Sequence, residues 1–291
     1  MSSSCVAIGT FDGVHRGHQG LIDKLVSISK KTKTKSIIVA LSKPVRHVSG
    51  LLSELSEKKS LLNEFSVNEV CILPVTRALI NMSAQDFLTQ FLVGKLRCRH
   101  LVVGQNFAFG HSRHGDVRWL KKNCPQHHIG LAVERFTSSH GKVISSSRIR
   151  ALLHSGRLEF ASRLLGRLYS FEGLPQKGRG LGHKIGVPTI NLKVAPEKLL
   201  PLGIFAAVAS ARNSFFPAIV NIGRRPTIEK NGAVIPEVNL LGYKGRWGKE
   251  KLKVFLLKHL RKERQFRNIK ELKNQINNDL WKARRYFGFT F

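Results

Sequence analysis

Apolar and polar positions follow two different periods along the first half of the chain. Short runs rich in apolar and β-branched residues predict strands at 5–8, 37–41, 70–74, 100–103 and 129–133. Apolar positions at helical spacing predict helices at 21–26, 51–65, 83–96 and 117–122. Ser83 and Asp86 have the spacing of a capping box, which marks the start of the third helix. Strands that alternate with helices predict a parallel sheet with crossover helices, an α/β unit.

The pattern changes in the second half. Short helices are predicted at 148–153 and 159–165, where Gly156 and Gly166 can end them. Seven of the ten prolines lie beyond residue 170. Apolar runs between turn residues predict strands at 204–209, 218–222, 234–241 and 252–257, followed by a basic helix at 269–286. This pattern indicates an antiparallel barrel or sandwich of about 120 residues.

Length and charge refine this picture. A chain of 291 residues is long enough for two domains with separate cores, which we place at 1–166 and 167–291. Lys and Arg number 49 against 18 Asp and Glu, so the net charge is +31 and the isoelectric point is near 10.8. Such a surface attracts anions, including nucleotides, nucleic acids and acidic lipids.

Several classes of protein are not expected. The longest uncharged stretches, 100–112 and 199–211, are shorter than the ~18 residues of a membrane span. The N-terminus has no basic segment before its apolar run, so we expect no secretion signal and a cytoplasmic location. The four cysteines form no C-x-x-C pair, which favours reduced, structural thiols over a disulfide or a zinc site.

The first candidate site directly follows the first predicted strand. The run from Gly9 to His18, GTFDGVHRGH, leads into a helix. Free N–H groups in the first turn of a helix and the helix dipole favour a bound phosphate. His15 and His18 flank Gly17, so both imidazoles can face one phosphate while the backbone approaches closely. The candidate nucleotide-binding residues are Gly9, Phe11, Gly13, His15 and His18; the alternative is a pair of structural histidines.

A second candidate lies at the end of this half, in the run ISSSRIR at 144–150. Ser145, Ser146 and Arg148 offer hydroxyls and a guanidinium where another helix is predicted to begin. Taken alone, the segment fits a simple N-cap. In a chain that also has the HRGH turn, it fits donors to the β and γ phosphates of ATP.

The second half opens with a third candidate, GRGLGHKIGVPTIN at 178–191. Glycines on alternate positions allow backbone N–H groups to close around a phosphate, although a glycine-rich turn alone is weak evidence. Thr189 and Asn191 lie two positions apart on a strand and therefore point to one face. Their hydroxyl and amide oxygens suit Mg²⁺ and phosphate. The alternative is an ordinary strand that ends in Asn.

These motifs resemble the bacterial bifunctional riboflavin kinase/FAD synthetase family. The N-terminal matches are GTFDGVHRGHQ at 9–19, VGQNFAFG at 103–110 with Arg113 and Gly115, and 145–150. The resemblance implies a Rossmann-like nucleotidyltransferase domain that adenylylates FMN. It places His15, His18 and Arg148 on the phosphate side, and Asn106, Phe107 and Phe109 on the flavin side. The phosphate of FMN would attack the α-phosphorus of ATP and expel pyrophosphate, so positioning and charge neutralisation would dominate catalysis.

The second half resembles the riboflavin kinase module of the same family. Its matches are PTIN at 188–191, LGIF at 202–205, NIGRRPT at 221–227, and Glu237 ahead of YKG at 243–245. The implied ATP-binding residues are Gly178, Gly180, Gly182, Lys184, Pro188, Thr189 and Asn191. Glu237 would be the general base that takes the proton of the riboflavin 5′-hydroxyl, the alternative being a carboxylate exposed on an edge strand. The implied ligands are riboflavin, FMN, FAD and ATP, with Mg²⁺ at Thr189 and Asn191.

The chain departs from the family after the second predicted strand. The family usually has T-F-x-P-H-P there, whereas this chain has ALSKPVRH at 40–47. Lys43, Arg46 and His47 are the candidates to replace the missing histidine, and the alternative is a chain with kinase activity only. Smaller departures are His183 for Arg, Val187 for Phe, and Val238-Asn239 for Thr-His.

Two further alternatives come from other classes of protein. Residues 247–291 hold 13 Lys and Arg against 4 acids, which would suit nucleic acid. These cations are interleaved with apolar helix positions, so a solvated face is favoured and nucleic acid is not expected as a partner. Aminoacyl-tRNA synthetases also have an H-x-G-H turn, but the chain lacks a run similar to K-M-S-K-S.

Overall fold

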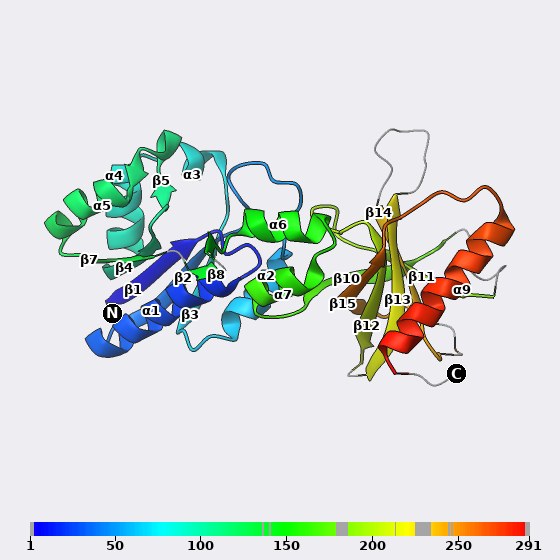
Figure 1. Ribbon diagram of the computed structural model, residues 1–291. Helices are drawn as coiled ribbons and strands as arrows, with labels where there is room; N and C mark the ends of the chain where they lie inside the picture. The colour runs from blue at the N-terminus through cyan, green and yellow to red at the C-terminus, as the bar shows by residue number, and fades with distance from the viewer. Residues whose placement is uncertain are drawn as a thin grey trace. The chain divides into compact units, whose positions relative to one another are not determined.

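The computed structural model describes residues 3–135, 137–139, 141–178, 186–212, 214–224, 234–243, 245 and 247–288. The chain divides into two compact units, an N-terminal unit of residues 1–146 and a C-terminal unit of residues 147–291 (Figure 1). Each unit is described by itself.

The N-terminal unit contains a five-stranded parallel sheet. Its strands are β1 (Ser4–Gly9), β2 (Lys35–Leu41), β3 (Glu69–Leu73), β4 (Cys98–Gly104) and β7 (Gly130–Glu134). They lie in the order β3-β2-β1-β4-β7, and every neighbouring pair is parallel. The five predicted strands and the Rossmann-like α/β fold are therefore confirmed. The chain order reverses between β1 and β4, the position at which open α/β sheets bind ligands.

Helices cover both faces of this sheet. Cys5 and Ala7 of β1 pack towards α1 (Arg16–Thr32) and α2 (Leu55–Asn63). Val6 and Ile8, which alternate with them, pack against η1 (Phe87–Lys95) and α5 (Val117–Asn123) on the opposite face. Because both faces are buried, consecutive strand positions are apolar, which explains the uninterrupted apolar runs of the sequence.

The helix predicted at 83–96 forms with an unexpected geometry. Ser83 caps it, with its Oγ accepting from the Asp86 N–H at 2.9 Å, so the predicted start is confirmed. After one turn, α4 (Ala84–Asp86), it continues as the π-helix η1, whose wider turn the apolar spacing did not indicate. The shorter elements of this unit are α3 (Arg77–Asn81), β5 (Ala108–Phe109), η2 (His111–Arg113), β6 (Gly115–Asp116), η3 (Cys124–His127), β8 (Ser138–Ser139) and β9 (Lys142–Val143).

The C-terminal unit is a closed antiparallel barrel with flanking helices. Its elements are α6 (Ser146–His154), which begins at the last residue of the N-terminal unit, α7 (Leu158–Leu165), β10 (Tyr169–Gln176), β11 (Ile190–Lys193), β12 (Gly203–Ala211), β13 (Ser214–Arg224), β14 (Val234–Leu240), β15 (Leu252–Arg261) and α9 (Ile269–Tyr286). The strands close in the order β10-β11-β14-β13-β12-β15, which decides for a barrel over a sandwich. The strand β10 was not predicted. The helix α9, red in Figure 1, has its predicted bounds and packs on β12, β13 and β15.

Among the described residues, no helix is long and apolar enough to cross a membrane. All four cysteines are free, and Cys5, Cys98 and Cys124 are buried in the N-terminal unit. Burial raises the pKa of the Cys5 and Cys124 thiols to about 11, so these thiols stay protonated at neutral pH.

Candidate functional site

The turn between β1 and α1 has an unusual backbone. Phe11 and Val14 have φ angles of 49° and 37°, in the left-handed region that bulky and β-branched residues rarely adopt. Gly13, at φ 82°, adopts the same region without steric cost. Strain of this kind costs of the order of 1–3 kcal/mol per residue and persists only where the surroundings impose it. The turn is therefore held in shape by other contacts.

Buried polar groups supply those contacts. The Asp12 carboxylate is buried, and its Oδ1 accepts from the N–H groups of Leu52 at 2.9 Å and Ser53 at 3.2 Å. The Gly13 N–H donates to Ser53 Oγ at 3.0 Å. Residues 51–54, predicted as the first turn of a helix, form this anchor instead, and α2 begins only at Leu55.

The two histidines of the motif meet at the start of α1. His15 is the N-cap, and its Nδ1 accepts from the His18 N–H at 3.3 Å. The two imidazoles are stacked, with ring centroids 3.7 Å apart and planes 14° apart. A Cβ at Gly17 would lie 3.2 Å from the His15 ring, so the glycine leaves room for that ring. With Nδ1 as an acceptor, neutral His15 has its proton on Nε2.

A buried lysine lies close to this pair. Lys58 is 1% exposed, and its Nζ donates to the carbonyls of Leu41 at 2.8 Å and Ser42 at 3.3 Å, where β2 ends. Burial lowers the pKa of Lys58, and the carboxylate of Asp12 opposes that shift. Burial also lowers the pKa of His18 well below its usual value, and the charges of His15 and Lys58 add to this effect. His18 is therefore neutral at pH 7.

The residues predicted on the flavin side follow β4, the neighbour of β1 in the sheet. Phe107 and Phe109 are stacked with centroids 5.4 Å apart, and Trp119 packs edge-on against Phe109 at 5.7 Å. A Cβ at Gly115 would lie 2.7 Å from the Phe109 ring, so this glycine makes room for it. The Asn106 side chain lies beside Gly104 in the same turn. The histidine turn and this aromatic segment therefore leave adjacent parallel strands at the same edge of the sheet.

Two more predicted segments reach this edge. Ser146 Oγ donates to the Asp12 carbonyl at 2.9 Å, which places the predicted serine segment, with Ser145, beside the histidine turn. Arg148 lies on α6, in the C-terminal unit. Lys43 and Arg46 follow β2 and are exposed.

The barrel assembles its candidate site by strand register. Asn191 on β11 pairs with Glu237 on β14, and Glu237 pairs with Asn221 on β13. Asn221 pairs with Ile204 on β12, and Ile204 pairs with Arg261 on β15. Residues opposite each other on adjacent antiparallel strands project from the same face. The five residues therefore form a row across five strands, which we call the barrel row.

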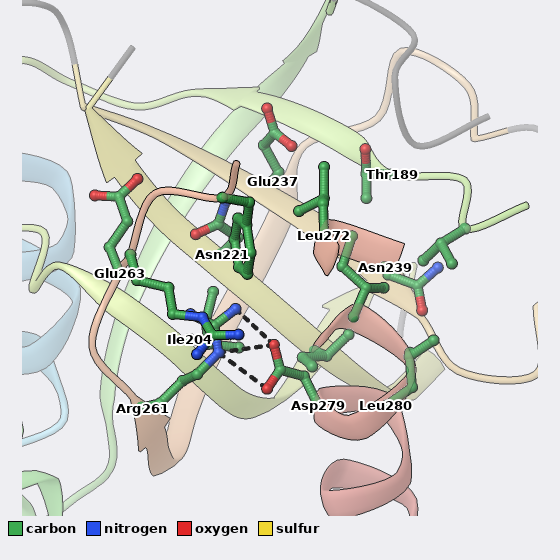
Figure 2. Close-up of a pocket in the computed structure, with 15 residues that line it drawn as sticks. Thr189, Ile204, Asn221, Glu237, Asn239, Arg261, Glu263, Leu272, Asp279 and Leu280 are labelled. Atoms are coloured by element: carbon green, nitrogen blue, oxygen red, sulfur yellow. Dashed lines mark hydrogen bonds and ion pairs between the residues drawn. The ribbon is translucent and has the colours of Figure 1, made fainter. Parts of the chain in front are cut away.

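Two cavities adjoin the barrel row. The first, of about 440 Å³, is lined by Glu237, Asn221 and Arg261 among others (Figure 2). The second, of about 530 Å³, is lined by Gly178, Asn191 and the aromatic residues Tyr243 and Trp247. Thr189 lines both cavities. Both volumes suit a small ligand.

Comparison with known proteins agrees with the division of the chain into two units. The family model for FAD synthetase matches residues 1–148, and that for riboflavin kinase matches residues 165–287. The chain is 30% identical to the bifunctional riboflavin kinase/FMN adenylyltransferase of Buchnera aphidicola subsp. Acyrthosiphon pisum, over 99% of this chain and 94% of the relative. The chain belongs to the bifunctional riboflavin kinase/FMN adenylyltransferase family. The member from Escherichia coli strain K12 is 32% identical, over 98% of this chain and 94% of its own length.

A solved structure shares the fold. The crystal structure described as a macrolide-efflux protein from Streptococcus pneumoniae superposes with a TM-score of 0.85 and 22% identity, covering 98% of this chain and 95% of that one. At this identity the likeness concerns the fold alone. The family membership expected from the motifs is confirmed by the relatives.

The residues around Thr189 show how the family motif is held in this chain. A Cβ at Gly178 would collide with the Asn191 amide, so a larger residue there would require the Asn191 side chain to move. Asn239, which replaces the family's usual histidine, donates from Nδ2 to the Pro188 carbonyl at 2.7 Å. This bond ties β14 to the start of the P-T-x-N segment. The predicted residues Gly180, Gly182 and Lys184 lie outside the described part of the chain.

Several residues of the barrel site were not predicted. Asn221 lines the first cavity, and its Oδ1 is buried and has no hydrogen-bond partner among the described residues, so it is an acceptor available to a ligand. An Asn within an apolar strand was the available signal for it. The first cavity is also lined by Arg261, Glu263 and Asp279. In the sequence, nothing distinguishes these residues from the other charged residues of the basic C-terminal segment.

Proposed function

We propose that this chain catalyses two consecutive reactions. In the barrel, the γ-phosphate of ATP is transferred to riboflavin and gives FMN. At the histidine turn, the AMP part of a second ATP is transferred to FMN and gives FAD and pyrophosphate. The observation that carries this proposal is the tandem match of both family models to one chain, each on a unit with its own set of polar residues. We retain 1–166 and 167–291 as the two functional domains.

The two cavities support separate binding sites for riboflavin and ATP in the kinase. Riboflavin occupies the first cavity, where Ile204, Leu272 and Leu280 offer apolar surface to its ring system and Glu237 accepts the proton of the attacking 5′-hydroxyl. ATP occupies the second cavity. Thr189 lies where the γ-phosphate has to pass from one ligand to the other. The main contribution of the barrel is to hold the two reactants in line for this transfer.

The donor set at the barrel site fits a magnesium ion. The Thr189 hydroxyl and the Asn191 side-chain oxygen are hard oxygen ligands, and Mg²⁺ binds through such groups together with substrate phosphates. Bound there, the ion would neutralise charge on the transferring phosphate. Thr189 and Asn191 would hold it from β11 and the residues just before that strand.

The N-terminal site supports adenylyl transfer without a covalent intermediate. His15 and His18 donate hydrogen bonds to the phosphates of ATP, and the first turn of α1 adds its N–H groups and dipole. Gly9, Phe11 and Gly13 shape this turn, and Ser145, Ser146 and Arg148 contact the leaving pyrophosphate. Asn106, Phe107 and Phe109 bind the flavin, while Lys43 and Arg46 attract the phosphate of FMN.

The test is a time course with purified protein, riboflavin, ATP and Mg²⁺, in which chromatography separates riboflavin, FMN and FAD. We expect FMN first and FAD later, with one pyrophosphate released per FAD. A parallel reaction that starts from FMN should give FAD without the kinase step. FMN without FAD would show kinase activity alone, and the absence of both products would contradict the proposal.

A further inference from the structure

One wall of the first cavity is supplied by the C-terminal helix. Leu272, Ile276 and Leu280 of α9 line the cavity, together with Asp279 of the same helix and Arg261 at the end of β15 (Figure 2). We propose that the ion pair between Arg261 and Asp279 positions α9 against the barrel and thereby sets the affinity for riboflavin. This inference rests on the proposed kinase function. We call Arg261, Asp279 and the supporting Gln275 the α9 latch.

The latch has the geometry of a strong, buried ion pair. Arg261 Nε donates to both carboxylate oxygens of Asp279, at 3.0 and 2.9 Å, and Nη2 donates to Oδ2 at 2.7 Å. Gln275 Nε2 donates to Oδ1 at 2.8 Å. The side chains of Arg261 and Asp279 are 18% and 3% exposed. Charge-assisted bidentate pairs of this kind fix orientation as well as distance.

The guanidinium is directed at protein groups. Nη1 donates to the Lys262 carbonyl at 2.9 Å. Arg261 thus uses Nε, Nη1 and Nη2 within the protein, and Figure 2 shows its contacts with Asp279 as dashed lines. Arg261 and Asp279 are therefore positioning residues for the cavity wall rather than catalytic residues.

The remaining attachment of α9 is small. Of the residues of this helix, Asp279 and Ala283 are buried. Ala283 packs with Ile204, Ile219 and Leu241 in a small apolar cluster, against which the partly buried Leu280 and Phe287 also pack. Loss of one latch partner would leave a buried charge unpaired, which is far more costly than loss of an exposed pair. The helix would then shift from the barrel, and the apolar wall of the cavity would move with it.

The reacting groups do not depend on α9. Glu237 and Asn191 are held by strand register on β14 and β11. A shifted α9 therefore weakens riboflavin binding while the phosphoryl-transfer geometry is retained. The signature of the latch is a rise in the KM for riboflavin with little change in kcat or in the KM for ATP.

The experiment uses the full-length protein and three variants. Asp279→Asn keeps the shape of the side chain and removes its charge. Arg261→Lys keeps the charge and removes the bidentate geometry of the guanidinium. Gln275→Ala removes one supporting hydrogen bond. We expect the KM for riboflavin to rise about tenfold or more in the first two variants and about two- to fivefold in the third. In each, kcat per active site should stay within about twofold of wild type. Glu172→Gln is the matched control, because it removes the partly exposed ion pairs of Glu172 on β10 with Lys251 and Lys253, and it should change neither constant.

Binding measured by quenching of riboflavin fluorescence gives a second readout, and the Kd should rise in parallel with KM. If Asp279→Asn fails to fold, as judged by near-ultraviolet circular dichroism, Arg261→Lys and Gln275→Ala decide. Unchanged KM and Kd in the folded variants overturn the latch, as does a loss of kcat with KM unchanged. A wild-type protein that binds riboflavin without phosphorylating it refutes the proposed function, and the Kd values then still test the latch. A wild-type protein that does not bind riboflavin refutes both.

Discussion

The histidine turn and the barrel row are built in opposite ways. The turn collects its functional groups from ten consecutive residues, Gly9 to His18, and holds them with a strained backbone and buried polar anchors. The barrel row collects one residue from each of five strands, so Asn191 and Arg261 belong to one row of paired residues although 70 positions separate them. A site within one turn depends on the conformation of that turn, whereas a site assembled from several strands depends on the correct pairing of those strands.

The two sites also differ in electrostatics. At the turn, burial and neighbouring positive charge keep His18 neutral, and the buried Lys58 and the dipole of α1 supply the positive potential. At the barrel row, the carboxylate of Glu237 is partly buried and lines the first cavity. The turn suits stabilisation of anionic phosphates, and the barrel row suits removal of a proton from a hydroxyl.

The largest effect is expected from removing the proposed general base of the kinase site, which should impair one of the two reactions only. Glu237→Gln keeps the shape of the side chain and removes the base. General base catalysis contributes about 10²- to 10⁴-fold, so the kcat for FMN formation should fall by that factor with little change in the KM for riboflavin. FAD formation from supplied FMN should be unaffected. Steady-state assays of both reactions on one preparation check this.

The control for that variant is Glu172→Gln, which changes a half-exposed carboxylate on β10 outside both cavities. Near wild-type kinase turnover in Glu237→Gln would contradict the role of Glu237. Loss of both activities would indicate that the change disturbs folding instead.

The next effect concerns the histidine turn. His15→Ala and His18→Ala should each lower the kcat for FAD formation about 10²- to 10³-fold, because each removes a hydrogen bond to charge that develops in the transition state. FMN formation should persist. His128→Asn, at an exposed left-handed position, is the control, since Asn tolerates this conformation. FAD production by the double variant above a tenth of wild type would show that the site is misassigned.

A smaller effect is expected in the pH dependence of stability. The pKa of His18 lies below its usual value of about 6.5 in the folded chain, so the unfolded chain binds one more proton as pH falls below that value. The free energy of unfolding of the N-terminal unit should therefore fall with pH, by up to ~1.4 kcal/mol per pH unit from this group. Above pH ~6.5 the contribution is fully present.

Urea unfolding from pH 7.5 to 4.5 measures this effect. Replacing Trp247 and Trp281 by Phe leaves Trp119 to report on the N-terminal unit. His18→Asn in this background should show a flatter pH dependence than its parent, because other groups titrate equally in both. Parallel curves would mean that His18 is not held neutral by its surroundings.

The smallest effect concerns the segment that departs from the family. Lys43→Ala and Arg46→Ala should each raise the KM for FMN about two- to fivefold, since both side chains are exposed and screened by solvent. Kinase activity and the KM for ATP should stay unchanged. Lys59→Ala, an exposed lysine on α2, is a control for general loss of positive charge. An effect of equal size in the control would remove the specific role of the segment.

The same comparison explains what could be predicted from the sequence. Periodicity indicated the five strands of the parallel sheet, and the motif from Gly9 to His18 marked the candidate site after the first of them, because both are local properties of the chain. The π-helical form of η1 and the strand β10 were missed, since the apolar spacing of one resembles an α-helix and the other includes Pro175. Asn221, Arg261 and Asp279 were not assigned to the barrel site because only strand pairing and helix docking bring them together.

The central claim is that one chain contains two independent sites that act in sequence. Mixing two variants, each with one of the two sites inactivated, tests it most directly. Glu237→Gln supplies only the adenylyltransferase, and the His15→Ala/His18→Ala double variant supplies only the kinase. With riboflavin, ATP and Mg²⁺, neither variant alone should make FAD at an appreciable rate, whereas the mixture should make FAD after a lag in which FMN accumulates. A mixture that makes no more FAD than its two components separately would contradict the account.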